Sequence, residues 1–523
     1  MKRIVLLIVL GVVLNGCTDD FLDQPLRGQQ ELDDFFASAE ASERFVNGIY
    51  QKVNGEGWAQ INFFRTINGM ASDDQWSGNT EQPRADITGI AHFNVFPGSA
   101  YINSFWEHNY IGITRANLAL DQISEVEMDE DHKARLLAET KFLRAWFYFE
   151  LVKNYGGVPI VTTWDELFEP EVYEYTRNSV EEVYTQIEQD LNDAIAVLPL
   201  KSMYAQKDFG RATRGAAQSL LGKAYLYQEK WMEAEQMFEN VIQSNEYQLE
   251  DNFADVWKPN HRYGVESIFE VGYINNEQFP NIGGVYSTTQ GSRADLGWSW
   301  GTPTSNLENA FLSEGDSIRL RSTIIKHGEP VYGDPEVTEF DAAPARNKSG
   351  RINRKYYVPT ADRPEPYQIG QHPLSHIHIR YADVLLMHAE AAYFNGNEQE
   401  ALESLAKVRD RVELETNMNL SGPTLRDAIW KERRLELALE LHRLYDIRRQ
   451  KINGTPRISL IMGPNGSFVD YNLNENDDPF ETTNMGEAMN KGVLFDESIH
   501  ILWPIPPEEI QLSQGRIEQN PGY

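Results

Sequence analysis

Apolar residues recur along much of the chain at intervals of three and four, the spacing of one face of an α-helix. This spacing predicts helices over residues 100–126 and 131–155, and the second is apolar on most sides, so we expect it to be buried. Ser179, with two glutamates in the next three positions, is typical of an N-cap and predicts a helix that runs to about Leu198. Another helix is expected to begin near Thr213. The chain is therefore predicted to be mainly α-helical.

Two stretches have the spacing of a tetratricopeptide repeat, in which small residues allow two antiparallel helices to cross closely. The first contains Leu221, Gly222, Tyr225, Ala234 and Phe238, and the second contains Ala389, Ala401 and Leu405. A stable stack usually needs three or more units. The helices at 100–155 and 424–451 are therefore interpreted as degenerate further units of a scaffold that spans 100–247 and 376–451.

Two regions interrupt this helical pattern. Residues 248–375 are rich in Gly, Pro, Asn and aromatic side chains, with short β-like runs such as Ser267–Val271. The stretch 452–523 has a similar irregular part from Thr455 to about Ser498. Because loops on a rigid scaffold are common binding sites, we expect these loop-rich and small β insertions to form the ligand face.

The N-terminus has the features of an export signal. Two basic residues precede the apolar run Ile4–Leu14, which is typical of a secretory signal peptide over residues 1–16. Leu14-Asn15-Gly16 then leads into Cys17, the single cysteine of the chain, in the pattern of a bacterial lipobox. A lone cysteine has no intramolecular disulfide to form. We therefore expect Cys17 to be the lipid-attachment site and residues 17–40 to be a tether.

The net charge and the absence of several motifs exclude some classes of function. The formal net charge of −32 argues against binding to nucleic acid, whose phosphates would be repelled, and to anionic lipid surfaces. The chain contains no phosphate-binding loop, no dinucleotide fingerprint and no His-Glu-x-x-His. Chance pairs among its 79 acidic residues nevertheless leave a glycoside hydrolase or lyase open.

Metal signals are also sparse, and we predict no metal and no cofactor. His372, His376 and His378 lie close together in the sequence, but positions 376 and 378 fit one face of a strand as well as a metal site. The acidic stretch 474–478 offers oxygen ligands for a structural calcium ion, yet it lacks EF-hand spacing, so an acidic surface loop is favoured.

Two clusters combine aromatic and polar residues in irregular segments. Sugars stack their C–H faces on Trp and Tyr, while amides, carboxylates and Arg bind the hydroxyl groups. The first cluster contains Trp58, Asn62, Arg65, Asp73, Asp74, Gln75 and Trp76, and the second contains Tyr286, Arg293, Asp295, Trp298 and Trp300. The alternative to ligand binding is that each tryptophan is buried and packs its loop onto the scaffold. Trp76 and Trp298 are the stronger candidates, whereas Trp106, Trp146, Trp231 and Trp430 lie on periodic helices and are expected in the core.

A C-terminal helix carries charges three and four residues apart, which is the spacing of ion pairs on and between helices. The charged residues are Glu432, Arg433, Glu436, Glu440, Arg443, Asp446 and Arg449. We interpret them as a structural network and not as catalytic groups.

Several stretches resemble the SusD/RagB family of nutrient-uptake lipoproteins. The longest is Glu139 to Pro159, and others are Phe21-Leu22-Asp23, Arg211 with Thr213, residues 303–319, 380–391 and 432–449, Trp503-Pro504-Ile505-Pro506, and Gln519-Asn520-Pro521-Gly522-Tyr523. The matches run in order, so the resemblance covers the whole chain. In addition, Asp19 and Asp20 resemble the lipoprotein export signal of Bacteroidetes, which directs lipoproteins to the outer face of the outer membrane.

The resemblance implies one α-helical protein built on about four tetratricopeptide-like units, with a ligand face of loops and small β pieces. It also implies a binding protein, not an enzyme, that caps a SusC-like TonB-dependent outer-membrane transporter. Such a protein passes the transporter oligosaccharides, or peptides in the RagB branch. A surface glycoside hydrolase or lyase, and a repeat scaffold that binds only another protein, are the alternatives.

Overall fold

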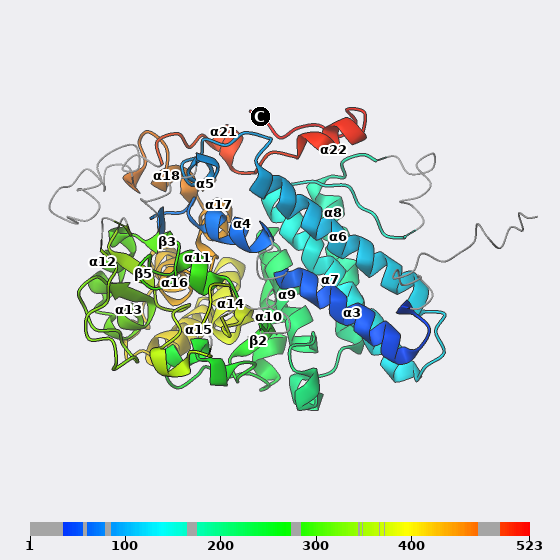
Figure 1. The fold of residues 1–523 in the computed structure, drawn as a ribbon, viewed down its shortest axis with the longest axis horizontal. Helices are drawn as coiled ribbons and strands as arrows, with labels where there is room; N and C mark the ends of the chain where they lie inside the picture. Colours follow the sequence, from blue (N-terminus) through cyan, green and yellow to red (C-terminus); the bar gives the residue numbers. More distant parts are fainter. Residues whose placement is uncertain are drawn as a thin grey trace, which may run out of the picture.

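The computed structural model describes residues 35–55, 60–78, 85–164, 175–273, 284–343, 346–347, 349–365, 367–370, 372–468 and 492–523. The expected signal peptide, Cys17, Trp58 and the acidic stretch 474–478 lie outside these residues. Within them the protein is mainly α-helical, as the apolar periodicity predicts (Figure 1).

The scaffold is a series of helices in which each packs on the next. Its order is α6 on α7, α7 on α8, α8 on α9, α9 on α10, α10 on α14, α14 on α15, and α16 against both α14 and α15. The bounds are α6 Ala100–Ile123, α7 Glu130–Tyr155, α8 Val180–Val197, α9 Arg214–Tyr227, α10 Trp231–Gln243, α14 Tyr381–Asn395, α15 Glu398–Asp410 and α16 Gly422–Glu436. Helix α3, Ala39–Asn54, packs along α6 and α7 (Figure 1). This arrangement confirms the tetratricopeptide-like repeat fold.

Local sequence signals account for where these helices start. Ser179 forms a capping box with Glu182 at the start of α8, and the Thr213 hydroxyl accepts a hydrogen bond from the backbone N–H of Ala216 at the start of α9. Each cap satisfies a backbone donor that the first helical turn leaves without a partner. Both predicted starts are therefore confirmed.

Small residues set how closely the paired helices cross. A Cβ atom at Gly222 would lie 2.6 Å from the Phe238 ring, and one at Gly112 would lie 2.5 Å from the Phe147 ring. Real Cβ atoms do not approach other atoms so closely, so glycine is required where α9 meets α10 and where α6 meets α7. The close approach at Gly222 is the one that the repeat spacing predicts.

The C-terminal helix expected to carry the charged residues is interrupted. Helix α16 ends at Glu436, and α17 begins again at Arg443 and runs to Arg449. Between them, Leu439 and Leu441 have φ angles of 63° and 71°, a left-handed conformation that leucine rarely adopts. The interruption brings the Glu440 carboxylate to Arg380 and Lys355, and these charge-assisted contacts offset the backbone strain.

The β structure consists of small antiparallel pairs. Among the described residues, β1 (Gln75–Ser77) pairs with β3 (Trp300–Pro303), β2 (Ser267–Val271) with β6 (His376–Arg380), β4 (Ile324–Lys326) with β5 (Arg351–Asn353), and β7 (Lys451–Ile452) with β8 (Thr455–Pro456). The β-like run at Ser267–Val271 is thus confirmed as a strand.

Short helices lie between these strands and in the C-terminal region. They are α4 Gln60–Gly69, α5 Ala85–Ala91, α11 Tyr286–Gln290, α12 Ser305–Glu314, α13 Ser317–Thr323, α18 Arg457–Ile461, α21 Glu497–His500 and α22 Pro507–Leu512. In Figure 1, α12, α13 and β5 gather at the end of the molecule away from the long helices α3 and α6. The described parts of the insertions are therefore short elements as well as loops.

Candidate functional site

The β1–β3 pair joins the two aromatic clusters. Trp76 lies opposite Thr302, and Ser77 lies opposite Trp300, although these strands are far apart in the sequence. The Thr304 hydroxyl also donates to the Asp73 carbonyl over 2.8 Å, which extends the contact beyond the strands. Two segments that the sequence indicates separately thus form one region.

An aromatic group lies beside this strand pair. The Trp298 ring centroid is 4.9 Å from that of Trp300 and 5.7 Å from that of Phe63. Trp300 and Phe63 are buried, but Trp298 is only half-buried. The Trp298 backbone N–H donates to the Thr288 carbonyl over 2.7 Å, which fixes the loop next to α11. Trp298 therefore presents part of an anchored indole to solvent.

Polar side chains lie in the same loop as this indole and on the segment that binds that loop. Arg363 makes two parallel hydrogen bonds to Asp295, of 2.9 and 2.6 Å, and its guanidinium carbon lies 4.5 Å from the centre of the Tyr367 ring. Arg293 donates through Nη1 to the Gly297 carbonyl over 3.3 Å. All of these side chains are half-buried. We define the Trp298 surface as Arg293, Asp295, Trp298, Arg363 and Tyr367.

Sequence reasoning missed Arg363 and Tyr367. They lie in an irregular segment without periodicity. Arg363 reaches the site through its hydrogen bonds to Asp295, and Tyr367 contacts His372. The His372 ring is 4.8 Å from that of Tyr367, and its Nε2 lies 3.0 Å from the Thr288 hydroxyl.

Trp76 does not present its ring to a ligand in this structure. It is 3% exposed, and its ring centroid lies 5.9 Å from that of Phe468. Trp300, the neighbour across the strand pair, is 6% exposed. Both tryptophans lie on short strands in which every residue is buried. The polar and glycine residues beside Trp76 in the sequence were therefore not a sign that its ring is exposed.

Tyr286 and Asn62 form a buried hydrogen-bond cluster. The hydroxyls of Tyr286 and Tyr273 donate to the Asn62 side-chain oxygen over 3.3 and 3.4 Å. The Tyr286 ring also stacks on Tyr356 with centroids 5.1 Å apart. These side chains hold α11 against α4 and are not available to a ligand at the surface.

Asp73 and Asp74 are bound by two arginines that flank the α16–α17 interruption, Arg434 on α16 and Arg443 on α17. Arg443 contacts both oxygens of Asp73 over 2.8 and 2.9 Å, and Arg434 lies 2.7 Å from Asp74. Burial alone would raise the pKa of Asp73, but Arg434 and Arg443 hold it well below its usual range. These carboxylates act as structural counter-ions, so they are not free to bind sugar hydroxyl groups.

Arg65 lines an interior cavity of about 50 Å³ together with Glu150, Lys153, His376 and His378. The side chain is buried, and neither Nη atom has a hydrogen-bond partner in the structure. A cavity of this volume has room for water molecules. Arg65 therefore does not reach a glycan at the surface.

The clustered histidines are structural. His376 and His378 lie on β6 with ring centroids 4.6 Å apart, as the alternation predicts. His376 Nδ1 is 2.6 Å from the Tyr356 hydroxyl, and His378 Nε2 is 2.7 Å from the Asn54 side-chain oxygen. Burial lowers the pKa of both imidazoles well below the usual value, so both are neutral at pH 7.

The tryptophans expected in the core are largely confirmed. Trp106, Trp146 and Trp430 are at most 5% exposed. Trp231 is only half-buried and stacks on Phe394 with centroids 4.4 Å apart.

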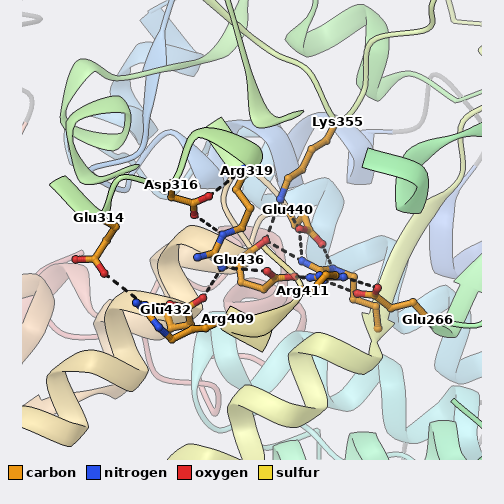
Figure 2. A network of polar contacts seen from close by, with 11 residues as sticks. Glu266, Glu314, Asp316, Arg319, Lys355, Arg409, Arg411, Glu432, Glu436 and Glu440 are labelled. Atoms are coloured by element: carbon orange, nitrogen blue, oxygen red, sulfur yellow. Dashed lines mark hydrogen bonds and ion pairs between the residues drawn. The ribbon is translucent and has the colours of Figure 1, made fainter. Parts of the chain in front are cut away.

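Three of the charged C-terminal residues, Glu432, Glu436 and Glu440, belong to a buried network, shown in Figure 2. Arg380 contacts Glu440 over 2.8 Å and both Glu436 and Glu266 over 2.6 Å, and Arg319 contacts Glu432 over 2.5 Å. This confirms a structural role. Most ion-pair partners of the α16 and Glu440 carboxylates lie on β6, on α13 and in loops, and not on the same helix. The spacing of charges along one helix did not predict these partners.

Two family models match the chain. Residues 20–226 match the model described as "Starch-binding associating with outer membrane", and residues 296–523 match the "SusD family" model. The SusD-like protein P2 of Formosa agariphila is 24% identical over 99% of this chain and 98% of its own length.

Solved structures give the same result. A laminarin-binding SusD-like protein superposes with a TM-score of 0.73 at 29% identity, covering 93% of this chain and 99% of its own. A SusD-like protein from Bacteroides fragilis superposes with a TM-score of 0.76 at 25% identity, covering 95% and 100%. The chain belongs to the SusD-like family.

A search of the described helices for a membrane span was negative: each is too short or too polar to cross a bilayer.

Proposed function

We propose that this protein binds an oligosaccharide or polysaccharide at the cell surface and delivers it to a SusC-like TonB-dependent transporter of the outer membrane. Membership of the SusD-like family supports the proposal, as do relatives whose names refer to laminarin and starch binding. The observation that carries it is the Trp298 surface, where a half-buried indole shares its loop with Asp295, and Arg363 joins Asp295 to Tyr367.

The chemistry of this surface suits a glycan. A pyranose has apolar C–H faces that pack against an indole, and its hydroxyl groups need donors and acceptors around that contact. Trp298 supplies the apolar face, and its contacts with Trp300 and Phe63 hold the ring in place before a ligand arrives. Arg293, Asp295 and Tyr367 supply polar groups at the rim. A preformed site of this kind limits the entropy lost on binding.

A binding role is favoured over catalysis at this surface. A glycosidase needs two carboxyl groups that flank the scissile bond, one of them able to donate a proton. The Trp298 surface contains one carboxyl group, Asp295, and both of its oxygens accept hydrogen bonds from Arg363. Incubation of the purified protein with polysaccharides should therefore produce no new reducing ends, and robust turnover would favour the hydrolase or lyase alternative.

The location follows from the lipobox and the family. We propose that the protein is anchored to the outer membrane through lipids on Cys17 and faces the cell exterior. Residues 17–40 would act as the tether between the anchor and the first described helices.

Loss of the indole tests the proposal directly. Trp298→Ala should weaken binding at least tenfold in affinity gels and calorimetry with a panel that includes laminarin and starch, because stacking supplies much of the contact. Trp231→Ala, which removes another half-buried tryptophan from α10, is the matched control and should bind like the parent. Equal binding by both variants would refute the role of Trp298. Binding of peptides and of no glycan would place the protein in the peptide-uptake branch.

Delivery needs a separate test. The tagged protein, extracted from its native membrane in detergent, should co-purify with a TonB-dependent transporter. If the transporter co-purifies but no saccharide binds, the protein-only scaffold alternative is favoured.

A further inference from the structure

Three potential metal ligands meet where helix α10 packs on α14, away from the Trp298 surface. Glu235 and Glu239 are one turn apart on α10, and His388 lies on α14. One ligand atom from each lies within 4.8 Å of the other two. The two helices belong to different repeat units, so the three side chains lie across a packed interface in the scaffold.

His388 is directed to this cluster with one nitrogen free. Its side chain is 3% exposed, and Nδ1 lies 2.8 Å from the Ser404 hydroxyl on α15. Nε2 is buried and has no hydrogen-bond partner in the structure. Burial lowers the pKa of His388 to about 4, so the ring is neutral at pH 7. In the tautomer that donates Nδ1–H to Ser404, Nε2 carries a lone pair, which is the arrangement of a metal-binding imidazole.

The first glutamate is held in place by amide groups. The two oxygens of Glu235 accept hydrogen bonds from the side-chain amides of Asn397, over 2.7 Å, and Asn395, over 2.5 Å. Glu235 is 4% exposed. Hydrogen bonds of this kind orient ligating carboxylates in known metal sites.

The second glutamate connects the cluster to solvent. Glu239 is half-buried, and burial together with the charges of Glu235 and Glu400 raises its pKa. Lys407, which is exposed on α15, also lowers the pKa of His388 through its positive charge. A cation between Glu235 and Glu239 would relieve their repulsion.

We propose that Glu235, Glu239 and His388 bind one divalent transition-metal ion, with zinc as the best fit, and that water completes the coordination. Zinc takes imidazole nitrogen and carboxylate oxygen at about 2.0–2.2 Å, which requires ligand atoms about 3.4 Å apart in a tetrahedron. The ligand atoms, now within 4.8 Å of one another, would have to move closer together, and Glu239 is the least buried of the three residues. Calcium and magnesium prefer an all-oxygen set, so the imidazole disfavours them. The ion would cross-link two repeat units.

Zinc titration of the full chain carrying Cys17→Ala tests this site, because the substitution removes the single thiol. After removal of metals with EDTA, calorimetry with zinc chloride should show one ion per chain. Zinc at a hundredfold excess over its dissociation constant should raise the melting temperature by about 2 °C. Crystals grown with zinc should show an anomalous peak between α10 and α14.

Conservative variants make the result specific. Glu239→Gln and His388→Gln should each weaken zinc binding at least tenfold while circular dichroism stays unchanged. Glu233→Gln removes an exposed carboxylate from the same helix and should bind like the parent. Absence of zinc binding by the parent would overturn the proposal. So would equal affinity in Glu239→Gln, or a preference for calcium over zinc.

Discussion

Glu440 offers the sharpest test of how the buried charge network contributes to stability. Its carboxylate is 4% exposed and is held by Arg380 over 2.8 Å and by Lys355 over 2.6 Å. Replacement by glutamine keeps the size of the side chain but removes its charge. Arg380 would retain Glu436 and Glu266, whereas Lys355 would retain the Glu436 carbonyl.

The size of the effect follows from the pKa of Glu440. Burial alone would raise this pKa, but Arg380 and Lys355 lower it from 4.5 to about 2. Each pH unit corresponds to about 1.36 kcal/mol between the charged and neutral forms, so the charge stabilises the folded state by about 3 kcal/mol. Because the folded pKa lies below the unfolded value, this stability is present above pH 4.5 and is lost as the pH falls towards 2.

Urea unfolding of the parent and of Glu440→Gln, at pH 7 and pH 3, measures this contribution. The free energy of unfolding should differ by about 3 kcal/mol at pH 7 and by about 1.5 kcal/mol at pH 3. Glu403→Gln, an exposed residue on α15, should change it by less than about 0.5 kcal/mol at either pH. A difference below 1 kcal/mol at pH 7, or one that is the same at both pH values, would refute the electrostatic explanation.

Three further predictions concern the core, the scaffold and the anchor. Trp76→Ala should lower the free energy of unfolding by about 3–5 kcal/mol, since the ring is buried against Phe468; unchanged unfolding would contradict this. Gly222→Ala should cost about 1–3 kcal/mol by overpacking against Phe238, and adding Phe238→Leu should recover part of it; a neutral Gly222→Ala would disprove the close crossing. Cys17→Ala should move the protein from the membrane fraction to the soluble one, with glycan affinity unchanged by calorimetry; retention on the membrane would exclude Cys17 as the anchor.

Periodicity and capping residues were enough to predict the helical scaffold. The intervals of apolar residues located α6 and α7, and Ser179 and Thr213 marked the starts of α8 and α9, because these signals depend on local physics. The interruption of the C-terminal helix was not predictable in this way. Leu439 and Leu441 keep helical apolar spacing, and the break depends on partners such as Arg380 that lie far away in the sequence.

The sequence predicted which types of residue form the candidate site, but it did not predict which of their side chains are exposed. Trp76 and Trp298 have similar neighbours in the sequence, yet one is buried on a strand and the other is half-exposed in a loop. The β1–β3 pairing decides this difference, and a strand of three residues is too short to give a reliable alternating pattern. Arg363 and Tyr367 join the site through tertiary contacts alone.

A crystal structure of the protein with a bound oligosaccharide, chosen from the binding panel, tests the central claim most directly. The account predicts a sugar ring packed on the exposed face of Trp298 at about 4 Å, with hydroxyl groups bound by side chains of the Trp298 surface. A saccharide bound elsewhere, with the Trp298 ring uncovered, would contradict it.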